Sequence, residues 1–279
     1  MRCLSLLVLV GCSTPPACPE GQVRDAGDCV AYAPGDPVDR GAAWLPAAGT
    51  TWQWQLSGTI EADLAVAMYD VDLVDAPDSA LDAIVGRGAA LICYFSAGTV
   101  EDWRDDAGDF DDAAIGDKLP DWEGERWLDV NDSSVLAVME ARLDLAVARG
   151  CTGVEPDNVD GYANDNGVGL NASEQLRYNR WLADQAHLRG LSVGLKNDLD
   201  QIEDLLPWFD WALNEECAAY DECGRLSAFT DNDQAAFHVE YVDDWADAAA
   251  LADEVCGSGS ELSTLIKTWD LGAEWLDCT

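Results

Sequence analysis

Short apolar runs recur along the chain from residue 51 onward, and segments with helical periodicity separate several of them. Eight runs have the length of buried strands: 52–56, 64–70, 90–95, 153–157, 191–196, 208–215, 235–241 and 261–267. A further short run, 126–130, stands before a helical segment. Runs of this length that are bounded by turn residues favour strands.

Three segments carry the start and stop signals of helices. The segment 133–150 begins with serines and ends at a glycine, while 171–190 begins with Asn171 and Glu174 at the spacing of a capping box. A third helix is expected over 243–254. Strands that alternate with helices favour parallel pairing. Eight of them in about 230 residues predict an α/β fold, the (β/α)8 TIM barrel. No GxGxxG or GxxxxGK stretch follows a strand, which argues against a nucleotide-binding open sheet.

Polar and aromatic side chains collect where the predicted strands end. In a TIM barrel these ends form the active-site rim. The candidates for this rim are Trp54, Asp70, Tyr94, Asp129, Glu155, Asp157, Asn158, Lys196, Asn214, Glu215, Glu216, Glu240 and Tyr241. Because carboxylates packed together repel one another, they need a counter-charge, and Lys196 is the obvious one.

Carboxylates with aromatic rings at one rim suit glycoside hydrolysis. One carboxylic acid protonates the leaving oxygen, and a second carboxylate acts as a nucleophile or as a base on water. Rings such as Trp54, Tyr94 and Tyr241 are candidates for stacking on sugars. No CxxC pair is present and the two histidines, His187 and His238, stand apart in the sequence, so we expect no metal and no cofactor.

The N-terminus resembles the leader of a bacterial lipoprotein. Residues 1–11 form a short apolar leader, and the stretch LVGC ends at Cys12, the expected lipidation site. Residues 12–45 are rich in Pro, Gly and Ala, and we interpret them as a linker with a small Cys18–Cys29 loop. Residues 46–279 form the predicted barrel domain. This organisation predicts a protein of the bacterial cell envelope, anchored by lipid, most simply in the outer membrane, or secreted. The lipid is then its only contact with a membrane.

Cysteine usage agrees with export. Ten cysteines less Cys3 and Cys12 leave an even number, which favours disulfides in an oxidising compartment. Proximity in sequence pairs Cys18 with Cys29, Cys217 with Cys223 and Cys256 with Cys278. Cys93 and Cys151 remain, each beside a predicted strand.

The net charge of −39 restricts the partners. It excludes nucleic acid, whose phosphates would be repelled. It suits a cationic partner, although solubility or a salty habitat is an equally simple reading, and it favours a monomer.

The sequence also resembles glycoside hydrolase family 114. The matching stretches, in order, are WQWQL, YDVDL, ICYFSAGTVEDWR, ERWLDV, ARLDLAVARGCTGVEPDNVDGY, GLSVGLKND, WALNEECAAYDEC and FHVEY, which span roughly residues 51–241. Characterised members of that family are endo-α-1,4-polygalactosaminidases. The resemblance implies a TIM barrel with catalytic acids on the fourth and sixth strands, at Asp157 and Glu215.

The resulting hypothesis makes Asp157 the nucleophile and Glu215 the acid/base, with Glu155 and Glu216 as their respective competitors. A retaining mechanism is expected and inversion remains open. The expected partner is a cationic or partly acetylated aminopolysaccharide, whose ammonium groups would pair with Asp70, Asp129, Glu155, Asp198 and Glu240. Two alternatives stay open: an inactive, surface-anchored carbohydrate-binding barrel, and a different hydrolase of an aminopolysaccharide, such as a deacetylase.

Overall fold

The computed structural model describes residues 22–25, 28–31, 35–257 and 261–278. The predicted leader 1–11, the lipidation site Cys12 and Cys18, the predicted partner of Cys29, therefore lie outside the described residues. A hairpin of β1 (Gln22–Asp25) and β2 (Asp28–Ala31) falls within the stretch interpreted as a linker. Among the described helices, none combines the length and the apolar character needed to cross a bilayer.

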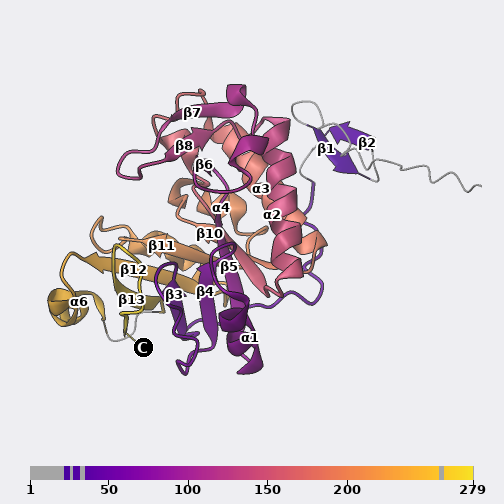
Figure 1. Ribbon diagram of the computed structural model, residues 1–279. Coiled ribbons are helices and arrows are strands. Elements are labelled where there is room, and N and C mark those ends of the chain that lie inside the picture. The colour runs from indigo at the N-terminus through magenta and orange to yellow at the C-terminus, as the bar shows by residue number, and fades with distance from the viewer. Residues whose placement is uncertain (1–21, 26–27, 32–34, 258–260, 279) are drawn as a thin grey trace, which may run out of the picture.

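Eight parallel strands form the centre of the molecule (Figure 1). Each corresponds to one of the eight predicted runs. In spatial order they are β3 (Trp52–Gln55), β4 (Met68–Asp72), β5 (Ala90–Ser96), β9 (Gly153–Asp157), β10 (Ser192–Lys196), β11 (Trp211–Glu215), β12 (Ala236–Val242) and β13 (Ser263–Thr268). The predicted second run starts too early, because residues 64–67 precede β4 and Asp70 lies inside the strand.

Side chains and a loop close the barrel between β13 and β3. The short strand β14 (Leu276–Asp277) pairs antiparallel with β13 and ends the sheet there. Leu56 and Ser57 donate backbone hydrogen bonds to Leu271 at 3.0 and 3.2 Å, and Trp52 Nε1 donates to the carbonyl of Ser263 at 3.0 Å. The two ends of the sheet are thereby held together without a direct β13–β3 ladder.

Alternation along the strands separates two apolar cores. Inside the barrel, Trp54, Met68, Ile92 and Leu213 belong to one cluster. Outside it, a larger cluster packs between the sheet and the helices. Because successive strand residues point to opposite faces, the inward series ends at the rim in Asp157, Lys196, Glu215 and Tyr241.

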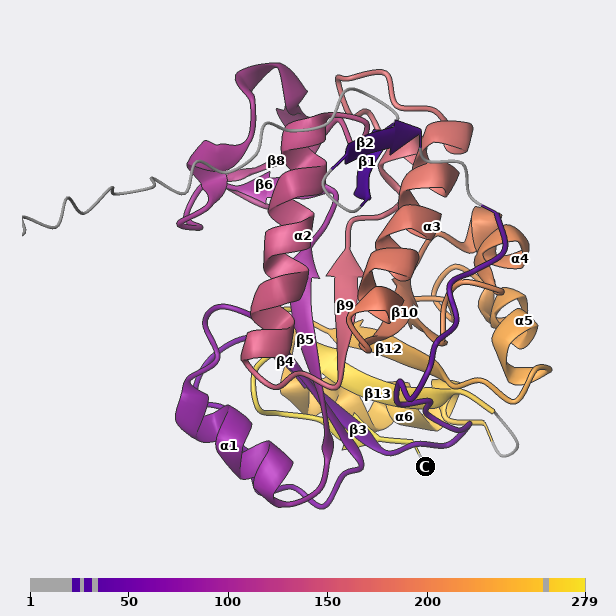
Figure 2. The same cartoon turned by 90° about the vertical axis from the view of Figure 1, so that its right-hand side faces the viewer.

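Helices cover the outside of the sheet. They are α1 (Asp78–Gly86), α2 (Ser133–Ala148), α3 (Ala172–Leu188), α4 (Ile202–Leu205), α5 (Ser227–Thr230) and α6 (Ala248–Val255), with 3-10 turns at Ala107–Asp109, Asp112–Ala114, Gly161–Ala163, Leu199–Gln201, Cys223–Leu226 and Trp245–Asp247. Figure 2 shows α2 and α3 running alongside the strands, where α2 packs on β9 and α3 packs on β10. The capping box of Asn171 and Glu174 forms as predicted. Asp132, rather than a serine, caps α2.

A small antiparallel sheet is inserted between β5 and α2. It consists of β6 (Thr99–Glu101), β7 (Ile115–Lys118) and β8 (Glu125–Leu128), in the order β6–β8–β7. The predicted run 126–130 overlaps β8, but the sheet itself was not predicted. It stands above the ends of the barrel strands at the top of Figure 1.

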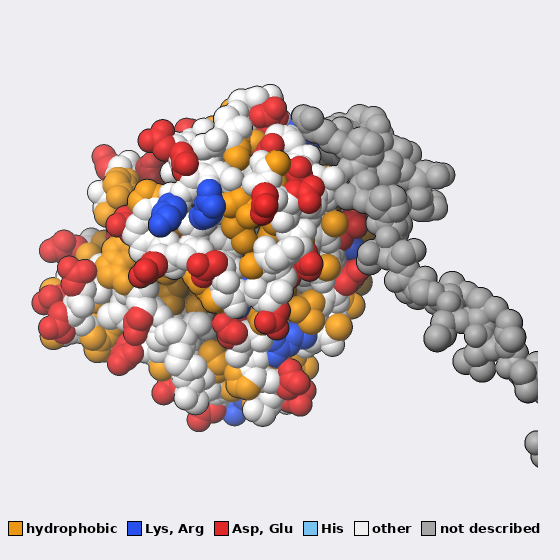
Figure 3. Space-filling model, turned by 45° about the horizontal axis from the view of Figure 1, so that its top comes forward, with side chains coloured by type: hydrophobic (Ala, Val, Ile, Leu, Met, Phe, Trp, Pro, Cys, Tyr) orange, Lys and Arg blue, Asp and Glu red, His pale blue; other side chains and the backbone are white. Residues whose placement is uncertain are grey.

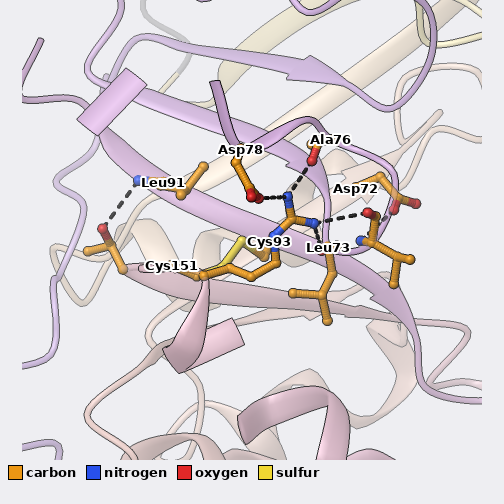
Figure 4. Close-up of a disulfide and its surroundings, with 10 residues drawn as sticks. Asp72, Leu73, Ala76, Asp78, Leu91, Cys93 and Cys151 are labelled. Carbon is orange, nitrogen blue, oxygen red and sulfur yellow. Dashed lines mark hydrogen bonds and ion pairs between the residues drawn. A yellow bond between two sulfur atoms is a disulfide. The ribbon is translucent and has the colours of Figure 1, made fainter. Parts of the chain in front are cut away.

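Three predicted disulfides are formed. Cys93–Cys151 joins β5 to the residues just before β9 (Figure 4). Beside it, Thr152 Oγ1 accepts a hydrogen bond from Leu91, and Arg149 donates to Asp78 and to carbonyls of the turn after β4. Cys217–Cys223 closes a turn after β11, and Cys256–Cys278 ties the end of α6 to the C-terminal segment.

Candidate active site

A cleft of about 710 Å³ opens at the carboxyl ends of the strands. Seven of the predicted rim residues line it: Trp54, Tyr94, Asp157, Asn158, Lys196, Glu215 and Glu216. The inserted sheet forms one wall, and the segment after β13, with Trp269 and Asp270, forms another part of the rim. Figure 3, which brings the side of the inserted sheet forward, shows acidic side chains scattered over this surface and few basic ones.

Lys196 joins the carboxylates at the centre of the site. Its Nζ lies 2.9 Å from Asp157 Oδ1, 3.1 Å from Glu215 Oε2 and 3.4 Å from Glu155 Oε1. Burial favours the neutral amine, but these three carboxylates outweigh it and hold the pKa of Lys196 well above its usual value. The ammonium also lies 4.9 Å from the centre of the Trp54 ring.

The two candidate catalytic carboxylates are held by further donors. Asp157 accepts from Tyr94 Oη at 3.1 Å and from the backbone N–H of Asn158 at 2.7 Å. Glu215 accepts from Asn197 Nδ2 at 3.1 Å and from Tyr241 Oη at 2.5 Å. Their side chains are 18% and 26% exposed, so both reach the cleft. Because one ammonium contacts both, their nearest oxygens lie no more than about 6 Å apart, close to the separation of retaining glycosidases.

Sharp turns after the strands place these donors. Asn158, Asn197 and Glu216, the residues that follow β9, β10 and β11, all have φ between 49° and 60°. This left-handed conformation is unusual for residues other than glycine, and asparagine tolerates it best. The loop after β5 packs directly on the first turn, because a Cβ on Gly98 would meet the Asn158 carbonyl oxygen at 1.7 Å.

Comparison with known proteins places the chain in a family. The sequence profile of glycoside-hydrolase family GH114 matches residues 35–279. The chain belongs to family GH114. It is therefore a glycoside hydrolase with an α/β barrel, as expected from the sequence.

Two solved structures support this placement to different depths. A crystal structure of Ega3 from Aspergillus fumigatus in complex with galactosamine is 38% identical, covers 88% of this chain and 100% of its own, and superposes with a TM-score of 0.83. The glycoside hydrolase domain of PelA from Pseudomonas aeruginosa is 13% identical in sequence, covers 83% of this chain and 98% of its own, and superposes with a TM-score of 0.64. At this identity the comparison shows the shared fold alone. No curated protein matches the sequence.

Glu155 and Asp70 lie beneath the cleft of this GH114 chain rather than in it. Both are fully buried. Glu155 Oε2 accepts from Trp54 Nε1 at 3.1 Å, and burial raises the pKa of Glu155 well above its usual value. No donor reaches either oxygen of Asp70 among the described groups, other than the neighbouring carboxyl of Glu155. Burial raises the pKa of Asp70 to about 8. Burial thus favours the protonated form of both carboxyls.

The raised pKa of Asp70 predicts how stability responds to replacing this residue. Asp70→Asn keeps an oxygen that can accept from the Glu155 carboxyl and should fold normally, whereas Asp70→Ala leaves that carboxyl without a partner and should lose roughly 1–3 kcal/mol at pH 7. The pKa of Asp70 is 3.8 in the unfolded state and about 8 in the native state. The native state therefore keeps a proton that the unfolded state has lost, and the free energy of unfolding of the wild type falls as the pH rises from about 3.8 to about 8. Urea unfolding should therefore show that Asp70→Asn gains stability relative to wild type as the pH rises. A stability difference between wild type and the Asn variant that stays constant over this pH range would show that Asp70 holds no proton in the native state.

Two other predicted site residues lie outside the cleft lining because the strand phase turns them outward. Asn214 and Glu240 neighbour the inward-facing Glu215 and Tyr241, and neither lines the cleft. Glu240 accepts from His238 Nε2 and from the backbone of Ala218. Burial opposes its ionisation, but these bonds outweigh burial and lower the pKa of Glu240.

Asp129 and Asp198 also lie outside the cleft lining. Asp129 accepts from Asn131 at the approach to α2. Asp198 accepts from Tyr162 and Asn179, and burial raises its pKa to about 8. Tyr241 touches the site through Glu215 and stacks on Trp269 at 4.1 Å.

One group elsewhere has the composition of a metal site. Cys217, Cys223 and His238 place ligand-type atoms within 4.8 Å of one another. The two sulfurs form a disulfide, and the ring nitrogens of His238 are hydrogen-bonded to Thr264 and Glu240. The donor atoms are thus already engaged.

Sequence reasoning missed several residues that line the cleft. Three are the exposed tryptophans Trp103, Trp122 and Trp269. Others are Asn197, which orients Glu215, and Arg104, which bridges Asp72, Asp75 and Glu101. The tryptophans carry no distinguishing pattern among twelve in the chain. Asn197 was within reach, because it stands directly after the strand that ends in Lys196.

Proposed function

We propose that this GH114 hydrolase cleaves α-1,4-linked galactosamine-containing polysaccharide within the chain, with retention of configuration. The observation that carries the proposal is the pair Asp157 and Glu215, which face one cleft and share the ammonium of Lys196. The galactosamine bound in the related Ega3 structure supports the class of sugar.

In the proposed mechanism Asp157 is the nucleophile. Tyr94, Lys196 and the Asn158 backbone direct three donors at its carboxylate and hold it in one orientation. Attack at the anomeric carbon forms a glycosyl–enzyme ester and breaks the glycosidic bond. The positive charge of Lys196, 2.9 Å from Asp157 Oδ1, offsets the repulsion between this carboxylate and its neighbours.

Glu215 is the proposed acid/base. It donates a proton to the leaving oxygen in the first step, and it then removes a proton from the water that hydrolyses the ester. Asn197 and Tyr241 fix its two oxygens. Glu155, although two residues from Asp157 and on the same face, is too deep to meet the substrate, and it supports Trp54 and Lys196 instead.

Product analysis tests this function. The purified protein is incubated with a galactosamine polymer at several degrees of acetylation, and new reducing ends, product lengths and the first anomer formed are followed. Oligomers of mixed length from the earliest time, released as the α anomer, are expected. No new reducing ends from any such polymer would overturn the proposal, and a β anomer released first would replace retention by inversion.

We also propose the location and organisation expected from the sequence: a leader over 1–11, a lipid on Cys12, a linker to residue 45 and a monomeric catalytic domain at the bacterial cell envelope. The disulfides of the barrel support an oxidising compartment. The strong negative charge would gather a cationic polymer. Mass analysis of the mature protein for a lipid on Cys12 tests the anchor.

A further inference from the structure

Three of the twelve tryptophans are unusually exposed. Trp52, Trp54, Trp181 and Trp211 are at most 1% exposed and belong to the cores. Trp103, Trp122 and Trp269 are 50%, 53% and 48% exposed, and all three line the catalytic cleft. Exposing so much apolar surface is unfavourable unless a partner covers it, and indole rings in a cleft suit the apolar face of a sugar ring.

We propose that Trp103 and Trp122 form a second sugar-binding subsite, which holds a galactosamine unit of the polymer away from the linkage being cut. The proposal rests on the proposed function and names where the chain extends. Trp103 follows β6 and Trp122 lies in the β7–β8 turn, so both belong to the inserted sheet rather than to the barrel.

The backbone around these rings is fixed in advance. Gly124 has φ +97°, and a Cβ there would lie 2.9 Å from the Trp103 ring and 2.7 Å from Asp102 Oδ1. Only a glycine lets the turn pass so close to the ring. Asp102 donates a backbone hydrogen bond to Gly124 at 3.1 Å, and Trp122 donates to Pro120 at 2.8 Å. A ring held before binding costs less conformational entropy when a sugar arrives.

The charges around the two rings favour an amino sugar. Asp121 stands between Pro120 and Trp122 in the same lining, and Asp75 and Glu101 lie nearby beside Arg104. In this part of the cleft, carboxylates outnumber the single arginine, which is engaged by three of them. An ammonium group is attracted here, whereas an acidic sugar would be repelled.

Trp269 belongs to a separate part of the rim. It stacks on Tyr241, which bonds Glu215, and its Nε1 donates to Asp243 at 3.2 Å. Aromatic surface is thus present next to the catalytic pair and again on the inserted sheet.

Two single variants and one control test the subsite. Trp103→Ala and Trp122→Ala should each raise KM for long galactosamine polymer about tenfold with kcat little changed, because a lost stacking contact of this kind is worth about that factor. Turnover of the shortest oligomer that is still cut should be unaffected. Trp103→Phe should recover part of the loss. Tyr220→Ala, a 69% exposed aromatic outside the cleft lining, should behave as wild type.

Binding measured without hydrolysis separates this proposal from the proposed function. In a Glu215→Gln background, calorimetry with a long deacetylated oligomer should show about tenfold weaker binding when Trp103 or Trp122 is replaced. Asp121→Asn should weaken the binding of the deacetylated oligomer but not the binding of the acetylated one. Unchanged binding in both tryptophan variants, or equal losses for the shortest oligomer, would overturn the subsite. A wild-type protein that binds the oligomer through these rings but cuts no polymer would overturn only the proposed function.

Discussion

Asp157→Asn and Glu215→Gln should each lower turnover of galactosamine polymer by about 10²- to 10⁴-fold, the range that a lost nucleophile or acid/base commonly gives. Both replacements are isosteric, and neither side chain is fully buried, so the fold should persist. Reducing-end assays measure the loss, and thermal unfolding confirms that the variants are folded. Either variant with near wild-type turnover would end the assignment of that residue.

The two variants should differ on a substrate whose leaving group needs no proton. An aryl galactosaminide supplies such a leaving group, so Glu215→Gln should regain much of the first step, while Asp157→Asn should regain nothing. Added azide should rescue each variant through a different anomer of glycosyl azide. The opposite pattern would exchange the two roles. Glu216→Gln is the matched control. Glu216 also lines the cleft, but it is itself the turn residue after β11 (φ 60°), and the carboxylates paired with Lys196 are Glu155, Asp157 and Glu215.

Periodicity was enough to predict the strands of the barrel, whereas the resemblance to family 114 singled out Asp157 and Glu215 as the candidate catalytic pair. Each of the eight runs became a strand because its apolar residues fill either the barrel interior or the space under the helices. The same alternation then fixes Asp157 and Glu215 on the inner face. Asn214 and Glu240 were misplaced because the prediction grouped all residues near a strand end and did not apply the strand phase to each one.

Depth and loop geometry were beyond the sequence. Asp70 has the same inward phase as Asp72, but it sits one layer lower, and only the three-dimensional packing shows that it meets Glu155. The inserted sheet depends on pairing between β6, β8 and β7, whose short strands lack a strong alternating pattern. Its tryptophans could therefore not be assigned to the cleft before the fold was known.

Lys196→Met should be the most damaging change to stability at the site. The Lys196 side chain is 3% exposed and its ammonium contacts three carboxylates, so its removal leaves these carboxylates close together without their counter-charge. Breaking a buried ion pair by removing one partner commonly costs about 3–5 kcal/mol, and we expect a loss of this size at pH 7 together with nearly all activity. Denaturant unfolding measures the first and reducing-end assays the second.

The pH dependence of this loss identifies its electrostatic origin. The raised pKa of Lys196 means that wild type keeps the stabilising ammonium throughout the range below the ordinary lysine pKa of 10.5, so its own titration contributes nothing between pH 5 and 8. In Lys196→Met the uncompensated carboxyls bind protons more readily in the native state, so acidification stabilises the variant relative to wild type. The loss of stability in Lys196→Met should therefore shrink from pH 8 to pH 5. Lys196→Arg keeps the charge and should keep most of the stability. Its turnover should be reduced, because a planar guanidinium cannot reproduce the three contacts that one ammonium nitrogen makes. A deficit that is the same at both pH values would show that lost packing, and not the lost counter-charge, destabilises the variant.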